Sequence, residues 1–148
     1  MKNIVIVGTN RDNSNTLRAL KDHLDLINYE LIELHKLKIE HYNYDQKQII
    51  QDDFLEIANK MTAARNIVFA TPVYWYSMSG IMKVFFDRFT DLITTSKPIG
   101  RALAGKSTFL FATGTEAALP VGFEVPFQKT SDYFAMNYKG AQYICTMD

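Results

Sequence analysis

The sequence contains little cysteine, no excess of either charge and no long apolar run. Its one cysteine, Cys145, excludes an internal disulfide and any cluster that needs several cysteines of one chain. Lysine plus arginine and aspartate plus glutamate each number 16, so bulk charge would attract neither nucleic acid nor an anionic membrane. No apolar stretch could span a bilayer, and residues 1–10 turn polar too early for a signal peptide. These absences indicate a cytoplasmic protein.

Several signatures of common catalytic sites are also missing. The loop after the first predicted strand has neither the G-x-G-x-x-G pattern of dinucleotide sites nor the Walker pattern of P-loops. Ser77 and Ser79 lack the G-x-S-x-G context of a hydrolase nucleophile, and the three histidines stand at no metal-ligand spacing. The sequence therefore predicts no metal site and gives little support to hydrolysis.

Strand-like and helical segments alternate along the 148 residues, which predicts one α/β domain over residues 1–148. The predicted strands cover residues 3–7, 29–34, 67–70, 107–113 and 141–146. Apolar residues at helical spacing predict four helices between them. One helix begins at an N-cap Ser79, and the last runs from Pro126 to a stop at Gly140. This alternation predicts a doubly wound parallel sheet with right-handed crossovers.

The loop after the first strand, residues 8–16, carries many groups that bind phosphate. It precedes a helix, whose first N–H groups and dipole favour an anion. Its hydroxyl, amide and guanidinium donors come from Thr9, Arg11, Ser14, Asn15 and Thr16. Asp12 is its only acid, and an ordinary capped turn, which uses several of the same residue types, would not need the arginine. The loop therefore predicts a phosphate site.

An aromatic loop follows the third strand. It consists of Pro72, Val73, Tyr74, Trp75 and Tyr76. Three aromatic rings in a surface loop suit a flat ligand, although they could also plug one end of the sheet as core residues.

A third loop follows the fourth strand and contains Thr113, Gly114 and Thr115. In the five-stranded order 2-1-3-4-5, strands one, three and four are adjacent, so the three loops converge at one end of the sheet. One loop suits a phosphate, one suits a flat ring, and the third offers hydroxyls and backbone amides. Together they predict a site for a mononucleotide.

Two motifs stand in these loops. Residues 8–16 read GTNRDNSNT, and the sequence Pro-Val-Tyr at 72–74 is followed by Ser79, Lys83 and the pair Asp87-Arg88. In both motifs the chain resembles the NAD(P)H-dependent FMN reductase family of flavodoxin-like proteins. The resemblance implies a flavodoxin-like sheet of order 2-1-3-4-5, with FMN as cofactor and NAD(P)H as electron donor. It places the donors of the first loop around the FMN phosphate, the aromatic loop against the isoalloxazine, and the third loop on the other edge of that ring.

The resemblance also implies an enzyme, in which FMN takes hydride from NAD(P)H and passes electrons to a quinone, a free flavin or a similar acceptor. The cofactor carries this chemistry, so no catalytic side chain is predicted. The alternatives are a flavodoxin-like electron carrier and a flavin-free binding relative. Such carriers are usually strongly acidic, whereas this chain is neutral.

The sequence ends at Asp148, just after the fifth predicted strand, where members of the family usually continue into a fifth helix. With that helix absent, strands three to five would stay partly open on the face that the first helix covers. Phe85, Phe86 and Phe89 also form an apolar arc wider than one sheet contact needs. Exposed apolar surface marks an association site, so we expect a homodimer or a larger closed oligomer.

Overall fold

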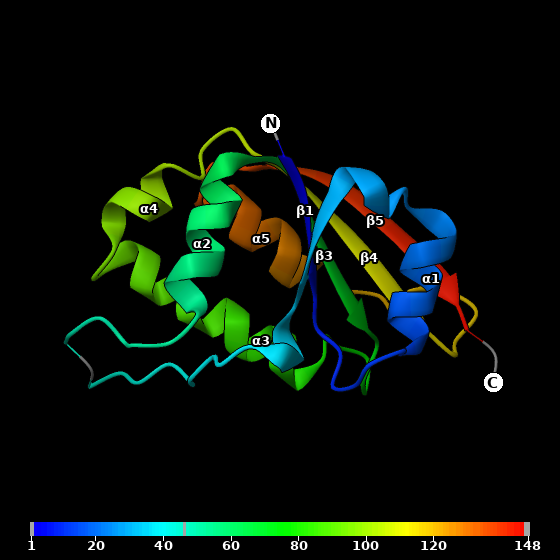
Figure 1. The fold of residues 1–148 in the computed structure, drawn as a ribbon. Helices are drawn as coiled ribbons and strands as arrows, with labels where there is room; N and C mark the ends of the chain where they lie inside the picture. Colours follow the sequence, from blue (N-terminus) through cyan, green and yellow to red (C-terminus); the bar gives the residue numbers. More distant parts are fainter. Residues whose placement is uncertain (1, 46, 147–148) are drawn as a thin grey trace.

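A computed structural model describes residues 2–45 and 47–146. Five parallel strands form one sheet in the order β2-β1-β3-β4-β5, as predicted (Figure 1). The strands are β1 Lys2–Val7, β2 Tyr29–Glu33, β3 Ala64–Pro72, β4 Ser107–Gly114 and β5 Asn137–Cys145. Strand β3 pairs with β1 on one side and with β4 on the other, so the loops after β1, β3 and β4 leave the sheet side by side.

Helices cover both faces of this sheet (Figure 1). The α-helices are α1 Asn15–His23, α2 Phe54–Ala63, α3 Gly80–Asp87, α4 Lys97–Arg101 and α5 Val125–Tyr133. The described residues also form the short 3-10 helices η1 Leu26–Asn28, η2 Leu34–Lys36 and η3 Arg88–Ile93. Helix α1 packs on one face over Val5, Val68 and Phe111, and the larger core on the other face unites α2, α3, η3 and α5.

Serine caps fix the start of the two helices nearest the predicted site. The Ser14 hydroxyl accepts a hydrogen bond from the Leu17 N–H at 3.1 Å. The predicted N-cap Ser79 is confirmed, since its Oγ accepts from the Met82 N–H at 3.2 Å. The same hydroxyl donates to the Gly8 carbonyl at 2.6 Å, so α3 is tied to the end of β1.

The phenylalanines of α3 and η3 belong to the core of the monomer. Phe85, Phe86 and Phe89 are at most 8% exposed. Phe86 lies edge-on to Phe127 of α5 and to Phe69 of β3, with ring centroids 5.1 and 5.0 Å apart. The arc is wider than one sheet contact needs, as expected, but α5 packs over its outer side, so the arc is not evidence for an association surface.

A buried ion pair network anchors the segment between η2 and α2. Arg88 is fully buried, and its guanidinium bonds to the Asp52 carboxylate at 2.5 Å, to Asp91 at 2.9 Å and to the Glu40 carbonyl at 3.0 Å. Asp52 also accepts from the backbone N–H groups of Glu40 and Phe54. This network holds Glu40 and Asp52 against Arg88 of η3.

Gly140 does not end the last helix, contrary to the prediction. Helix α5 ends at Tyr133, and the chain turns at Ala135, whose φ is +57°. Gly140 lies inside β5 with a φ of +113°, where the register between β4 and β5 shifts. A glycine is suited to that irregularity because it has no Cβ.

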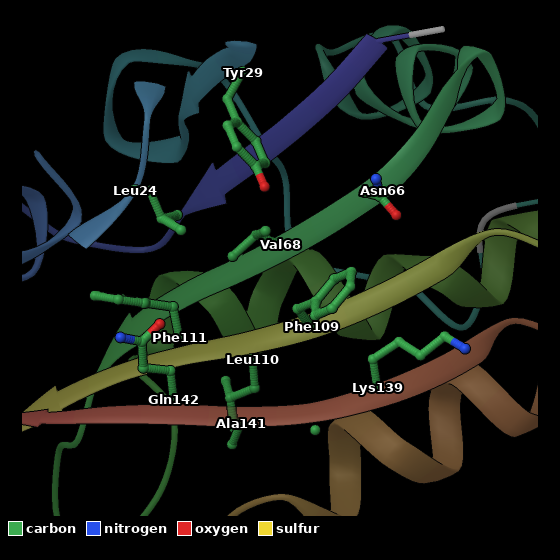
Figure 2. Close-up of a pocket in the computed structure, with 11 residues that line it drawn as sticks. Leu24, Tyr29, Asn66, Val68, Phe109, Leu110, Phe111, Lys139, Ala141 and Gln142 are labelled. Carbon is green, nitrogen blue, oxygen red and sulfur yellow. The ribbon is translucent and has the colours of Figure 1, made fainter. Parts of the chain in front are cut away.

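One face of the sheet is only partly covered. Within the described residues no helix follows β5, and α1 is the only α-helix on its side (Figure 1). This face holds a depression of about 310 Å³. Figure 2 shows the side chains that line it, which include Val68 of β3, Phe109 of β4 and Lys139 of β5. Among the described residues, no helix combines the length and apolarity that crossing a bilayer requires.

Candidate functional site

The three predicted loops meet in one cavity at the carboxyl ends of β1, β3 and β4. Its volume is about 440 Å³. It is lined by Thr9, Asn10, Arg11, Ser14, Asn15, Thr16, Pro72, Val73, Tyr74, Thr113, Gly114, Thr115 and Thr146. All the predicted site residues except Trp75 and Tyr76 are in this lining, and Asn10 and Thr146 are additional. Parallel strands bring their carboxyl ends to one edge, which is why loops far apart in sequence share one cavity.

The first turn of α1 borders the cavity with Asn15 and Thr16. The amino end of a helix dipole is positive, so this end of the cavity has a positive potential. The Ser14 oxygen already accepts from the Leu17 N–H, so its own proton is available for a ligand oxygen. Thr16 and Thr113 share a buried hydrogen bond between their hydroxyls at 2.7 Å, which links the first loop to the third. This end of the cavity can therefore hold an anion rigidly.

Arg11 adds a full positive charge to the same end. Its side chain lines the cavity, and within the described part of the chain its guanidinium has no hydrogen-bond or ion-pair partner. Asp12, its neighbour, does not line the cavity. The Asp12 carboxylate instead accepts a hydrogen bond from His35 Nε2 at 3.0 Å and lies 3.6 Å from the Lys36 ammonium. The bond from His35 and the charge of Lys36 lower the pKa of Asp12, so this acid remains ionised and neutralised outside the cavity.

The aromatic loop is a tight turn with an unusual backbone. Tyr74 and Ser77 exchange backbone hydrogen bonds of 2.9 and 3.1 Å. Between them, Trp75 and Tyr76 have φ values of +50° and +68°, in a region that costs a bulky residue about 1–2 kcal/mol. Tyr74 lines the cavity, whereas Trp75 is 92% exposed and Tyr76 64% exposed. The alternative that these rings plug the sheet is therefore wrong for Trp75 and Tyr76.

Gly114 shapes the third wall. A Cβ at this position would lie 2.8 Å from the Tyr143 Oη and 3.2 Å from the Val73 Cβ. Tyr143 in turn donates to the Glu116 carbonyl at 2.7 Å and so holds the third loop in place. The Val73 N–H donates to the Thr113 carbonyl at 2.7 Å, which carries the β3–β4 pairing up to the cavity. The walls are thus continuous with the sheet.

The structure also gathers residues that sequence patterns did not bring together. Ligand atoms of Asp12, Glu33 and His35 lie within 4.8 Å of one another. The Lys36 ammonium lies 2.8 Å from Glu33 and 3.6 Å from Asp12, so a side chain already supplies the positive charge that these two acids need. The adjacency of β1 and β2 was the available signal, since it places the residues after Glu33 beside the first loop.

Comparison with known proteins adds an independent observation. A family model described as NADPH-dependent FMN reductase matches residues 1–139. A protein of Bacillus subtilis (strain 168), provisionally named NAD(P)H-dependent FMN-containing oxidoreductase YwqN, is 27% identical over 149 residues. That alignment covers 95% of this chain and 82% of the relative.

Solved structures with the same fold include two from bacteria. The Trp repressor binding protein from Bacillus subtilis superimposes with a TM-score of 0.79 at 22% identity, covering 99% of this chain and 85% of that one. General stress protein 14 from Treponema denticola, solved in complex with FMN, gives a TM-score of 0.68 at 19% identity, covering 99% and 87%. At such identities the likeness shows the fold and leaves function to the site.

Proposed function

The chain belongs to the NADPH-dependent FMN reductase family, and on that premise we propose that it is an oxidoreductase that carries electrons from NADPH or NADH, through bound FMN, to a quinone, a free flavin or a similar acceptor. FMN is the cofactor of this family and a nicotinamide nucleotide its electron donor. The observation that carries the proposal is the cavity itself, because its lining combines Arg11, which has no partner among the described residues, and a helix N-terminus with Pro72, Val73 and Tyr74.

The donor set fits the phosphate of FMN. A terminal monophosphate carries close to two negative charges and three acceptor oxygens, and it needs several donors from one side. In the proposed complex these come from Thr9, Arg11, Ser14, Asn15 and Thr16. Thr9, Ser14 and Thr16 are all at most 6% exposed, so their hydroxyls are held in place by the surrounding fold. Asn15 also contacts Arg18, which fixes its position at the start of α1.

The remaining walls fit a flat ring. Pro72, Val73 and Tyr74 would border one edge of the isoalloxazine, and Thr113, Gly114 and Thr115 the other. Trp75 and Tyr76 follow Tyr74 directly and are exposed, so a ring that projects from the cavity would meet them at its open side. We propose that these two rings shape the route by which the nicotinamide and the acceptor reach the flavin.

Bound FMN supplies the hydride and electron transfer between the nicotinamide and the acceptor. The side chains of this chain bind and orient. Arg11 and the α1 N-terminus would hold the phosphate, and the hydroxyl pair of Thr16 and Thr113 would keep the two loops at a constant distance. Among the described residues that line the cavity there is no histidine or carboxylate, so no side chain there is assigned as a general acid or base.

Titration of the apo-protein with FMN, followed by quenching of flavin fluorescence, tests the cofactor site. Arg11→Ala should weaken binding by about 1.5–3 kcal/mol, the range for a hydrogen bond to a charged group. Arg101→Ala, at an exposed position of helix α4 and outside the cavity lining, is the matched control and should leave FMN affinity unchanged. Equal affinity of Arg11→Ala and the wild type, or equal affinity for FMN and FAD, would contradict the phosphate assignment.

Anaerobic mixing of the FMN-loaded protein with NADPH or NADH separates an enzyme from an electron carrier. Bleaching of the flavin absorbance on addition of either nucleotide is the expected result. A flavin that stays oxidised with both nucleotides, but accepts electrons from dithionite, would identify a carrier. A purified protein that binds no flavin would identify a binding relative.

We also propose that a second copy of this chain covers the open face of the sheet. The half-buried side chains of Leu24 and Phe109 leave apolar surface there, and parallel sheets are normally covered on both faces (Figure 2). A two-fold dimer would cover two such faces at once, and the formal charge of zero opposes self-association only weakly. Sedimentation at low micromolar concentration tests this. A dimer or larger closed oligomer is expected, and a stable monomer would refute the proposal.

A further inference from the structure

The loop that carries Arg11 is held by the strand beside it. Strands β1 and β2 are parallel neighbours, with Val7 opposite Glu33 at their carboxyl ends. The segments that leave these two ends are therefore adjacent: the phosphate-type loop after β1, and η2 after β2. His35 of η2 reaches across this gap, and its Nε2 donates to the Asp12 carboxylate at 3.0 Å.

The position of His35 allows it to hold the Asp12 carboxylate in place. His35 follows Leu34, which is fully buried in the core, and its own side chain is only 15% exposed. Its Nδ1 is buried and has no hydrogen-bond partner among the described residues. At a buried nitrogen without a partner, a lone pair costs less than an N–H group. His35 therefore favours the tautomer with its proton on Nε2. A neutral imidazole therefore suffices to bind the carboxylate.

Asp12 needs such a partner because of where it stands. It is the only acid in residues 8–16, it directly follows Arg11, and its side chain is 77% exposed. An unrestrained carboxylate there could pair with the Arg11 guanidinium, the usual partner of an exposed acid. It would then occupy the donor that the phosphate needs and neutralise the positive charge of Arg11.

We propose that His35 is a positioning residue for the phosphate site: it holds the Asp12 carboxylate outside the cavity and so keeps Arg11 free for the FMN phosphate. This inference rests on the proposed function, since it assumes that Arg11 binds phosphate. Lys36 assists, but its ammonium is 2.8 Å from Glu33 and 3.6 Å from Asp12, so it is shared between two acids. His35 makes the shorter contact to Asp12 and is the more buried of the two.

A set of four variants tests the idea. His35→Leu removes the donor and keeps most of the side-chain volume, whereas His35→Gln keeps an N–H donor. Asp12→Asn removes the charge, and the fourth variant combines His35→Leu with Asp12→Asn. Each apo-protein is titrated with FMN and with riboflavin, which lacks the phosphate, and its thermal unfolding is recorded by circular dichroism.

His35→Leu should weaken FMN binding roughly tenfold, the order expected when one charge-assisted hydrogen bond to phosphate is compromised. Riboflavin affinity should stay unchanged, and His35→Gln should bind FMN nearly as the wild type does. The decisive expectation concerns the double variant. Without a carboxylate at position 12 the loss of His35 should cost nothing, so FMN affinity should return to that of Asp12→Asn.

Two results would overturn the inference while leaving the proposed function intact. One is an equal loss of FMN affinity in His35→Leu and in the double variant. These two proteins differ only in the carboxylate at position 12, so an equal loss would show that this carboxylate does not cause it. The other is an equal loss for riboflavin, which would identify a general effect on folding. A wild type that fails to bind FMN would instead refute the proposed function, and this inference with it.

Discussion

Replacing Asp52 by asparagine should reveal how strongly the buried network stabilises the fold. The Asp52 carboxylate, like Arg88, is fully buried, and its two oxygens accept from the Arg88 guanidinium and from the N–H groups of Glu40 and Phe54. An amide cannot replace it, because its NH₂ group would face one of these donors. Removal of one partner from a buried ion pair costs about 3–5 kcal/mol. Since Asp91 still pairs with Arg88, we expect about 3 kcal/mol, a large part of the roughly 5–15 kcal/mol typical of a domain.

The effect should depend on pH with a definite sign. Burial alone would raise the pKa of Asp52, but the hydrogen bonds from Arg88 and from two backbone N–H groups outweigh it and lower the pKa below its ordinary value. The stabilisation is therefore fully present above the unfolded pKa, near about 3.9, and is lost as the pH falls through the lower folded pKa. The gap in unfolding free energy between wild type and Asp52→Asn should stay constant from about pH 5 to 8 and shrink below about pH 4.

Urea unfolding of the apo-protein, followed by circular dichroism, measures this gap. Asp87→Asn is the matched control, because Asp87 pairs with Lys83 at the surface, with side chains 46% and 58% exposed. Such an exposed pair contributes about 0.3–0.5 kcal/mol. A loss below about 1 kcal/mol for Asp52→Asn, or a loss equal to that of the control, would show that solvent reaches the network and that the burial argument fails.

Two further substitutions probe the aromatic turn and the contact between α4 and η3. Trp75→Ala should leave the stability of the apo-protein within about 0.5 kcal/mol of the wild type, because the ring is 92% exposed. It should change flavin affinity or the rate of flavin reduction by NAD(P)H. A large loss of stability with unchanged flavin behaviour would contradict this prediction. Gly100→Ala should cost about 1–3 kcal/mol in urea unfolding, since its Cβ would lie 2.1 Å from the Leu92 carbonyl oxygen; Gly80→Ala, with open space around its Cβ, is the control and should be neutral or stabilising.

The sheet order was predictable because its evidence is local and repeated. Each strand is a short apolar run, and each crossover carries a helical pattern, so the right-handed rule leaves few topologies. The end of α5 was not predictable in this way. Gly140 had the residue type of a helix stop, but Ala135 took the left-handed turn, and its carbonyl accepts from the Gly105 N–H at 2.9 Å. A tertiary hydrogen bond thus overrode the local preference for glycine.

The candidate site also contains residues that the sequence predicts and residues that it does not. Most cavity residues were predictable because they directly follow strands whose carboxyl ends lie at one edge of the sheet. His35 was not, since its importance comes from a neighbour in the sheet rather than from its own segment. The exposure of Trp75 and Tyr76 agrees with the surface loop that the sequence predicts, but their backbone conformation has no sequence signal, because turns with two positive φ values normally carry asparagine and glycine.

Because Trp75 is exposed, its intrinsic fluorescence can report ligand binding in this chain. Trp75 is the only tryptophan, and it is almost fully solvated in the folded state, so unfolding changes its surroundings very little. Its emission is therefore a poor indicator of unfolding and will differ from a circular dichroism signal in the same titration. The indole stands directly after Tyr74, a lining residue of the cavity, so a ligand bound there will alter its emission by contact or energy transfer. Tryptophan fluorescence in this protein should report occupancy rather than folding.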